Sequence, residues 1–429
     1  MTLTVPTPKA MQQHSGVRQG LSYGLLGMPL AFVALPLYVV LPNHYARTFG
    51  VPLAALGLVL LAARLFDAFI DPLIGRCCDR LFSRSASAVL WFGAGCMLLL
   101  ASGFALLLFP ITRAIAPLLV WALVMLVVTY AGYSGLSVAH QAWGAMLGGD
   151  ETYRSRVVAW REGMGLAGVV LASLAPLVVG LAGTVALFCV LLAAGWLAWS
   201  RSAAPQVSRE TSPWDLRLPF RTAPFRRLLA VFVLNGVASA IPATLVLFFV
   251  QDRLQAPRET ESYALAAYFL SAAVSMPLWL HLVGRLGLAR SWLVGMLLAT
   301  AAFSAAATLG AGDQTAFLVV CIASGIALGS DLALPGALLA GVIAQSGVRG
   351  NTAGAYFGWW NFATKLNLAL AAGLALPVLA WFGYVPGSRA SAGLEALTIA
   401  YCVLPCLLKL GAATLLYTTI IRSNQEPST

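Results

Sequence analysis

Apolar stretches follow one another along the 429-residue chain, separated by short segments rich in Gly, Pro or charge. Runs such as 114–128 are apolar on every helical face, which is typical of helices surrounded by lipid and lacks the alternation of a transmembrane β-barrel. A helix needs roughly 20 residues to cross a bilayer. The pattern predicts twelve membrane-spanning helices, at 21–41, 54–74, 88–109, 117–146, 163–179, 185–200, 228–250, 263–283, 292–309, 316–343, 355–382 and 394–420.

One long polar interval, 201–227, falls between the sixth and seventh predicted spans. We therefore expect an N-terminal six-helix bundle over 1–200, a cytoplasmic central loop and a C-terminal six-helix bundle over 228–429. A basic Gly turn follows the second span of each half, at Gly75-Arg76 and at Gly284-Arg285. The predicted fold class is an all-α integral membrane protein with two pseudo-symmetric bundles.

Composition excludes a soluble enzyme, because 60% of the residues are hydrophobic and only 10% are charged, against about 25% charged in soluble domains. The net charge of +11 comes from Lys and Arg that lie mostly at one predicted membrane side. The positive-inside rule then places both termini in the cytoplasm of a plasma (inner) membrane protein, and no nucleic-acid partner is implied. The seven cysteines include no CxxC pair and are expected to be small buried hydrophobes.

The few charges inside the predicted spans are the first candidates for function, because each costs roughly 2.5–3.5 kcal/mol at a helix centre on insertion scales. Arg64, Asp67 and Asp71 stand at i, i+3 and i+7 in the second span, so all three project from one helical face. We expect that face to look into a cavity or the bundle interior. The opposite face, with Leu65 and Phe69, suits lipid.

Two ionised carboxylates one helical turn apart repel each other, and burial disfavours their ionised forms further, unless a cation compensates. Asp67 and Asp71 therefore form a candidate cation site. Na⁺ prefers such oxygen ligands, and a proton satisfies the pair by neutralising one member. The alternative is an internal Arg64 salt bridge that only fixes helix packing. One Arg cannot neutralise two aspartates, so we favour the cation site.

Further intramembrane charges lie in the second half. Lys365 falls mid-span with Trp359 and Asn361 within about two turns, which suits a polar pocket with aromatic walls. Asp331 is expected to pair with Lys365, because an unpaired charge in either helix is expensive. Lys409 lies nearer the end of the twelfth span, and we expect it to extend its ammonium group to the membrane interface.

His140, in the fourth span, is either hydrogen-bonded in a helix interface or a proton relay. Other polar side chains are candidates for lining a central cavity, although each alone is more often a packing residue. They are Tyr38, Asn43, His44, Tyr130, Tyr133, Gln141, Trp143, Asn235, Tyr268 and Asn367.

The run from Arg64 to Gly75 has the form R-x-x-D-A-x-x-D-P-x-x-G and is followed by Asp79-Arg80. This run resembles the second-helix signature of the glycoside–pentoside–hexuronide:cation symporters, the melibiose-permease-like branch of the major facilitator superfamily. The basic segment 153–161 is similar to that family's loop after helix four, and 362–365 is similar to its helix-eleven segment. The resemblance covers nearly the whole chain.

The resemblance implies a role for each matching residue. Asp67 and Asp71 would be cation ligands, Arg64 a partner in helix two, Arg161 a substrate or gating residue, and Lys365 a link between cation and substrate sites. The chain departs from the family in lacking an acid in 23–29, in 137–141 and in 337–344. The first of these departures weakens the case for a galactoside-type sugar, and the second weakens the case for Na⁺ over H⁺.

The sequence thus predicts a cation-coupled secondary transporter, most simply a symporter, that carries a sugar, glycoside or related small organic solute by alternating access. Its partners would be that solute, sugar-like or amphiphilic, and membrane lipid, with Na⁺ or H⁺ as coupling ion and no other cofactor. Cytoplasmic inter-helix ion pairs that break during transport are expected at Asp79, Arg80, Arg154 and Arg156.

Two other substrates remain open, a lysolipid or similar amphiphile and a non-sugar solute coupled to protons. An integral-membrane enzyme is not favoured, because the chain has no HExxH motif, no GxSxG motif and no phosphate-cradling Gly-rich loop. A channel is less favoured still, because no filter segment repeats.

Overall fold

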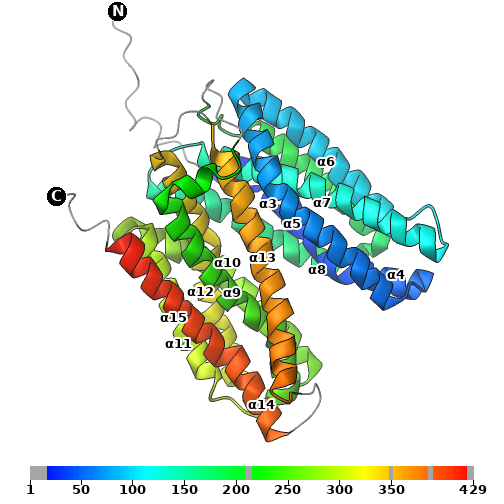
Figure 1. Ribbon diagram of the computed structural model, residues 1–429, viewed down its shortest axis with the longest axis vertical. Helices are drawn as coiled ribbons and strands as arrows, with labels where there is room; N and C mark the ends of the chain where they lie inside the picture. The colour runs from blue at the N-terminus through cyan, green and yellow to red at the C-terminus, as the bar shows by residue number, and fades with distance from the viewer. Residues whose placement is uncertain (1–16, 208–214, 347–350, 385–389, 423–429) are drawn as a thin grey trace, which may run out of the picture. The chain divides into compact units, whose positions relative to one another are not determined.

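The computed structural model describes residues 17–207, 215–346, 351–384 and 390–422, and all regular structure in these ranges is helical (Figure 1). The α-helices are α2 (Val17–Gly24), α3 (Gly27–Leu35), α4 (Leu41–Phe49), α5 (Leu53–Arg84), α6 (Ala86–Leu108), α7 (Ile115–Ala145), α8 (Glu151–Ser200), α9 (Ala223–Phe248), α10 (Arg258–Leu286), α11 (Leu288–Ala306), α12 (Gln314–Gln345), α13 (Ala353–Trp381), α14 (Ser391–Thr398) and α15 (Leu404–Leu416). Short π-helical or 3-10 segments occupy Pro36–Val40, Leu218–Arg221, Phe249–Arg253, Ile399–Val403 and Tyr417–Ile421.

Each of the twelve predicted spans coincides with helix in the described residues. The first is divided among α2, α3, the π-helical Pro36–Val40 and α4, and the last among α14, α15 and two π-helical segments. By length and composition, nine helices in the described part of the chain are apolar enough to cross a membrane. Helix α5, which carries Arg64, Asp67 and Asp71, is not one of these nine.

The fifth and sixth predicted spans form one long element, α8, with a break inside it. Gly180 has φ 66° and ψ −177°, a backbone conformation that side chains other than Gly rarely adopt. Pro176, four residues earlier, cannot donate the helical hydrogen bond and helps to bend the chain there. The predicted boundary between the two spans therefore appears as a kink with almost no loop.

The chain divides into two compact units. The N-terminal unit comprises Met1–Leu216 together with Gly347–Gly358, and the C-terminal unit comprises Arg217–Ser346 with Trp359–Thr429. Their boundary falls inside the predicted loop 201–227, of which 208–214 lies outside the described residues. Helix α13 begins in the N-terminal unit and continues in the C-terminal unit.

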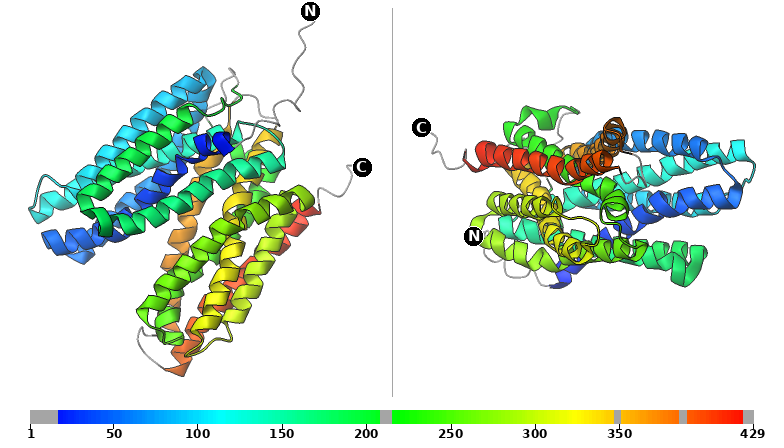
Figure 2. Two further views of the ribbon diagram at one scale, coloured as in Figure 1. Left: turned by 180° about the vertical axis from the view of Figure 1, so that it is seen from behind. Right: turned by 90° about the horizontal axis from the view of Figure 1, so that it is seen from below.

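Within the N-terminal unit, α2 and α3 pack on α8, while α5 and α6 both pack on α7 (Figures 1 and 2). Aromatic side chains fill its interior. The ring of Phe188 lies 5.9 Å from that of Phe32 and 4.8 Å from that of Phe104, and all three are fully buried. Helix α7 packs directly on α5, where the charged residues lie.

Within the C-terminal unit, α10 and α11 pack on α12, while α15 packs on α9 and α11. Its core includes a stack of Phe249 on Tyr401, with ring centroids 4.2 Å apart, and the buried Phe317 beside Phe249. Four helices, α9, α11, α12 and α15, thus converge in one unit and bring their polar residues together.

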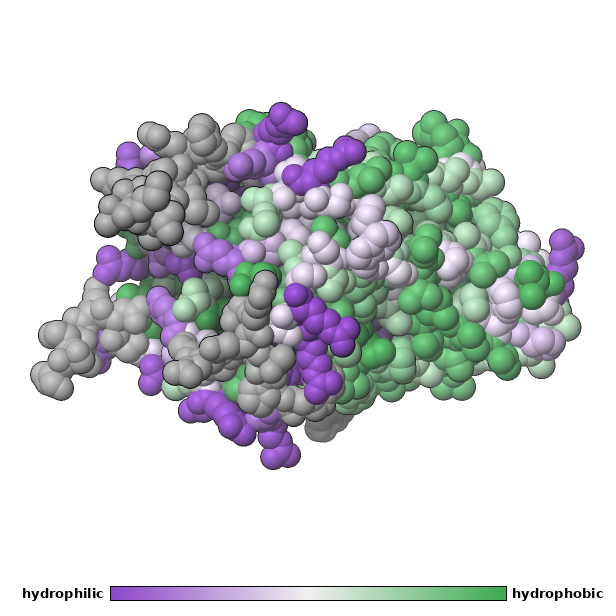
Figure 3. All heavy atoms as spheres, turned by 90° about the horizontal axis from the view of Figure 1, so that it is seen from above, coloured by the Kyte–Doolittle hydropathy of each residue, from purple (hydrophilic) through white to green (hydrophobic). Residues whose placement is uncertain are grey.

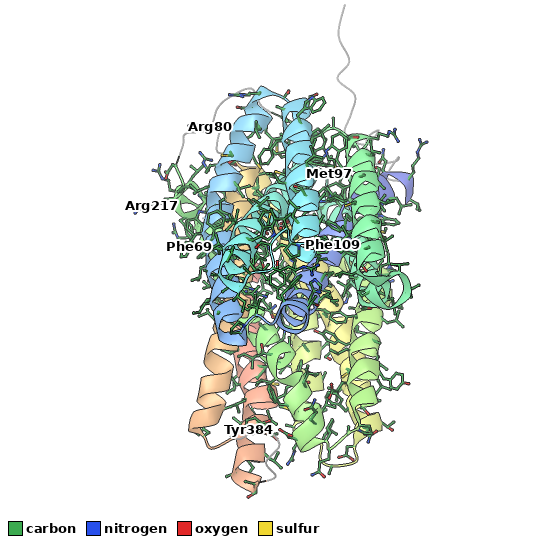
Figure 4. The ribbon with its side chains drawn as sticks, turned by 90° about the vertical axis from the view of Figure 1, so that its right-hand side faces the viewer. Phe69, Arg80, Met97, Phe109, Arg217 and Tyr384 are labelled. Atoms are coloured by element: carbon green, nitrogen blue, oxygen red, sulfur yellow. The ribbon has the colours of Figure 1, made fainter. Side chains whose placement is uncertain are left out.

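The outer surface carries many large apolar side chains, as lipid-facing helices do. Phe69 on α5 is 67% exposed, and Leu65 and Leu73 on the same face are also exposed, as the sequence pattern predicts. Figure 4 shows Phe69 pointing outward from α5. Hydrophobic residues cover most of the right-hand side of the view in Figure 3, where α6 and α7 lie. A surface of this kind is stable in lipid and unstable in water.

Helix α5 packs against the start of α13 through glycines. A Cβ atom on Gly75 would lie 2.1 Å from the carbonyl oxygen of Gly354, and a Cβ on Gly358 would lie 2.5 Å from the carbonyl oxygen of Asp71. Neither backbone oxygen can move away without moving its helix. Gly75, part of the motif in the second predicted span, is therefore required for a direct backbone-to-backbone approach.

We expect Gly75→Ala to destabilise the protein by about 1–3 kcal/mol, the usual cost of overpacking a close contact. Gly57→Ala is the matched control, because Gly57 lies on the same helix and a Cβ atom added to it would have nothing within 4 Å. Thermal unfolding of the two purified variants measures the difference. Equal unfolding midpoints would contradict the close approach.

Candidate functional site

The two aspartates of α5 are buried inside the N-terminal unit. Asp67 is 6% exposed and Asp71 is fully buried. The Ser134 hydroxyl on α7 donates a hydrogen bond of 2.8 Å to Oδ1 of Asp67. Carboxylates one helical turn apart in a low-dielectric environment repel strongly when both are ionised, and a bound Na⁺ or a proton relieves the repulsion. The arrangement is therefore chemically suited to bind a small cation.

Arg64 does not share the enclosure of these aspartates. Its side chain is exposed, although the spacing places it near the same face of α5. Of the predicted trio, the two acids are thus buried, whereas Arg64 is an exposed residue.

Asp79, near the end of α5, binds the beginning of α13. Its carboxylate accepts hydrogen bonds from the backbone N–H groups of Gly354 at 2.7 Å and Ala355 at 3.0 Å, and from Nη1 of Arg76 at 3.0 Å. Asp79 and Arg76 are both buried. An acid at a helix N-terminus satisfies unpaired N–H groups and complements the helix dipole. The predicted partner Arg80 is exposed, near the end of α5 (Figure 4).

The basic segment at the start of α8 differs in part from the expected inter-helix ion pairs. Nε of Arg154 donates to the backbone carbonyl of Asp150, at 3.3 Å, and no ion pair of Arg154 is found among the described residues. Its long side chain reaches the preceding turn of its own helix before it reaches another helix. Arg156 is half-buried beside Trp160.

Arg161, one turn further along α8, is neutralised locally. Its Nε and Nη2 atoms bond Oε1 of the adjacent Glu162 at 2.9 and 2.5 Å. The guanidinium group also interacts electrostatically with the hydroxyl of Tyr23 on α2. This local ion pair lowers the cost of keeping Arg161 inside the N-terminal unit.

His140 lies in a helix interface. Its Nε2 is 2.9 Å from the carbonyl oxygen of Tyr23, its ring stacks on the Tyr23 ring at 4.2 Å, and Trp199 approaches its edge at 5.6 Å. The Tyr23 hydroxyl in turn donates to the His140 carbonyl at 3.0 Å. Nδ1 is buried with no hydrogen-bond partner in the described part of the chain. This geometry favours the packing alternative over the proton relay.

The α13 residues predicted near the substrate are half-buried in the C-terminal unit. They are Trp359, Asn361 and Lys365. The Trp359 ring packs against Phe220 at 4.8 Å and against Phe362 at 5.4 Å. Trp359 therefore contributes to an aromatic cluster at the start of α13.

A network around Asp331 forms the polar centre of the C-terminal unit. Asp331 is on α12, and Nζ of Lys409, on α15, contacts its Oδ2 at 2.9 Å. Trp292 on α11 donates to Oδ1 at 2.8 Å, and Asn235 and Ser239, one turn apart on α9, donate at 3.0 and 3.3 Å. Lys409 also donates to Oδ1 of Asn235 at 2.9 Å. Three helices, α9, α11 and α15, thus supply the partners of one carboxylate on a fourth, α12.

This network corrects two predictions. Asp331 pairs with Lys409 and not with Lys365, and Lys409 does not extend to the interface, because its side chain is 3% exposed. The apolar neighbours of Lys409 suggested the second prediction, but packing of α15 on α9 and α11 encloses the lysine. The sequence pointed to Asn235 as a candidate lining residue, whereas Ser239 and Trp292 were missed because neither residue type is unusual in a span.

A cavity of about 190 Å³ adjoins this network inside the C-terminal unit. Asp331, Lys409 and Ser239 lie at its polar end, and the hydroxyl-bearing residues Tyr268 and Tyr401 also line it. The other lining residues are mostly apolar side chains from α9, α10, α11 and α12, such as Val246, Leu265, Phe269, Phe303 and Leu328. A cavity of about 150 Å³ holds benzene, so this one accommodates a single substituted ring.

Comparison with models of known protein families shows which family the chain belongs to. A family model described as MFS/sugar transport protein matches residues 22–423, nearly the whole chain. The chain belongs to this family. Its members are transporters, and the all-helical structure with its apolar outer surface is that of a membrane-spanning transporter. Among curated proteins, no relative matches the sequence.

Solved structures of major facilitator transporters share the fold of this family member. An outward-facing bacterial homologue of the iron transporter ferroportin is 16% identical, with a TM-score of 0.72 over 96% of this chain and 100% of that one. The E. coli fucose:proton symporter is 15% identical, with a TM-score of 0.65 over 91% and 98%. The human organic anion transporter is 16% identical, with a TM-score of 0.63 over 96% and 100%. These identities establish the fold and leave the cargo open.

We expect Lys409→Met to destabilise the protein, because it leaves Asp331 charged in a buried site, and breaking such a pair costs about 3–5 kcal/mol. The Asp331→Asn/Lys409→Met double variant removes both charges and should recover most of the loss. Thermal unfolding of the two variants tests this. An unchanged midpoint for Lys409→Met alone is the result expected of an interfacial lysine and would contradict the buried pair.

Proposed function

We propose that this transporter couples the movement of Na⁺ or H⁺ to that of a sugar, a glycoside or a related small organic solute, in the same direction and by alternating access. One observation carries the proposal: Asp67 and Asp71 are buried one turn apart on a single helix. Two buried carboxylates this close together attract a small cation, so retaining the pair makes sense when cation binding is part of the function.

Coupling follows from the free energy of that site. A cation at Asp67 and Asp71 relieves their repulsion and stabilises the conformation in which both carboxylates face it. If the same conformation binds substrate more tightly, the cation raises substrate affinity, and by reciprocity substrate raises cation affinity by the same factor. Ser134 supports the site by orienting the Asp67 carboxylate.

Asp79 is the residue best suited to gate this movement. It holds the first N–H groups of α13, and α13 continues from the N-terminal into the C-terminal unit. Any conformational change that displaces the start of α13 must break these hydrogen bonds. Replacing a capping acid costs about 0.5–2 kcal/mol, which is enough to shift a balance between two conformations.

The coupling ion can be identified before the substrate is known. In purified protein at constant ionic strength, exchange of choline for Na⁺ should raise the unfolding midpoint if Na⁺ binds the folded state, because a bound ligand stabilises it by mass action. Asp67→Asn and Asp71→Asn should each abolish the rise, and Ser134→Ala should weaken it. Asp313→Asn is the control, because Asp313 is an exposed acid in the turn before α12.

Uptake into proteoliposomes then tests transport itself. The substrate set consists of radiolabelled hexoses, pentoses, methyl glycosides and glucuronate, under imposed Na⁺ or proton gradients. We expect at least one solute to accumulate with a gradient, and accumulation to fall at least tenfold in Asp67→Asn and Asp71→Asn. Gradient-driven uptake that survives both substitutions would refute the cation site.

A second candidate substrate, a lysolipid or similar amphiphile, is favoured by one observation, the absence of an acid from 23–29, where sugar-carrying relatives have one. The cavity of about 190 Å³ in the C-terminal unit is too small for its acyl chain, so an amphiphile would be held elsewhere. Uptake of labelled lysophosphatidylcholine under the same gradients distinguishes it. Accumulation of the lysolipid without accumulation of any sugar would select the amphiphile.

A further inference from the structure

The charged residues that line the cavity beside Asp331 neutralise each other, which restricts the net charge of any ligand that it binds. Among the described residues lining it, Asp331 and Lys409 are the charged ones, and they neutralise each other at 2.9 Å. A ligand with a net charge would bring an uncompensated charge into a low-dielectric pocket, which is strongly unfavourable. The cavity therefore suits a solute without net charge.

Several hydrogen-bonding groups around the cavity are still available to such a solute. The Lys409 ammonium group has three N–H donors, of which Asp331 and Asn235 accept two. The bond from Ser239 to Asp331 is the longest in the network, at 3.3 Å, so a ligand hydroxyl can replace it most easily. A carboxylate is also a strong acceptor for hydroxyl groups.

Two tyrosines extend this polar edge. Tyr268 on α10 and Tyr401 line the same cavity, and Tyr268 interacts electrostatically with Asp331. Neither hydroxyl group has a hydrogen-bond partner in the parts of the chain that the structure describes. Buried tyrosine hydroxyls usually find a partner, so these two are available to a ligand.

The remaining lining residues of the cavity are mostly apolar, and two of them are phenylalanines. Phe303 and Phe269 line the cavity together with aliphatic side chains of α9 and α10. Flat apolar faces of this kind pack against the face of a ring, and a polyol with hydroxyls on every side would leave some of them without partners. The ligand must therefore have one polar edge and one apolar face.

We propose that this cavity is the substrate-binding site of the C-terminal unit and that it takes an uncharged, hydroxylated ring of monosaccharide size. Its hydroxyl groups bond Lys409, Asp331 and the two tyrosines, and its apolar face lies against Phe303. Deoxy sugars and methyl glycosides have this chemistry. The assignment extends the proposed transport function by naming where and how its substrate is held.

Cys321 provides a direct readout, because its free thiol lines the cavity. Full-length protein in lipid vesicles, free of glycoside detergents, is treated with N-ethylmaleimide, and modification of Cys321 is followed by peptide mass spectrometry. The exposed Cys77 in the same molecule is the internal control. The protecting solutes are aldohexoses, 6-deoxyhexoses, pentoses and their methyl glycosides, with glucuronate and glucosamine as charged counterparts.

We expect at least one uncharged sugar to slow Cys321 modification fivefold or more without affecting Cys77, while glucuronate and glucosamine give no protection at the same concentration. Protection should disappear in the Asp331→Asn/Lys409→Met double variant, in which the net charge of the residues lining the cavity stays at zero. It should weaken in Tyr401→Phe. Tyr417→Phe is the control, because Tyr417 is exposed on the following π-helical segment.

Three results would overturn the assignment: no protection by any uncharged sugar, equal protection by the charged ones, or a Cys321 that the reagent never reaches. The assay needs no ion gradient, whereas the proposed coupling is tested by gradient-driven uptake. Protection of Cys321 without gradient-driven uptake would support the proposed sugar site and refute the coupling. Gradient-driven uptake without protection of Cys321 would support the coupling and refute the sugar site.

Discussion

The cost of a charge in a bilayer accounts for where the ionisable groups of this protein lie. With 60% hydrophobic and 10% charged residues, the chain has few charges, and several of those enclosed by its helices have a compensating group nearby. Asp331 is held by Lys409 and three further donors, Arg161 by Glu162, and Asp79 by Arg76 and a helix N-terminus. Asp67 and Asp71 are two buried carboxylates on one face of one helix, and the proposed function assigns them to a small cation.

The two units of the structure therefore have different electrostatic characters. In the proposed function, the N-terminal unit holds the two carboxylates, Asp67 and Asp71, whose repulsion a bound cation relieves. The C-terminal unit contains a balanced ion pair beside a cavity, which keeps its energy low in the absence of any ion and favours an uncharged ligand. The two proposals thus place the ion and the solute at different sites in different units, so the two ligands do not compete for the same groups. A transporter can then couple their binding through its conformation alone.

Local sequence features predicted the helices and the acids of α5, whereas tertiary packing decided the partners of most other charges. A continuous apolar run can cross a bilayer only as a helix, because the helix pairs all of its own backbone groups. Every predicted span is accordingly helical. Likewise, i, i+4 spacing is a property of one helix, and it placed Asp67 and Asp71 together. The choice between Lys365 and Lys409 as partner of Asp331 depends on which helix packs beside α12, which no spacing rule reveals. Gly75 is a second example. The sequence showed the motif that contains it, but its close contact with Gly354 could be known only from the folded structure.

The central claim is that solute and cation cross the membrane together because they stabilise the same conformation. The most direct measurement is the reverse of gradient-driven uptake: a gradient of a transported sugar is imposed on proteoliposomes that have no ion gradient, and entry of ²²Na⁺ or of protons is recorded. Reciprocal coupling predicts that inward sugar movement drives ion entry in the wild type and not in Asp71→Asn. Sugar entry without any ion flux in the wild type would contradict the account.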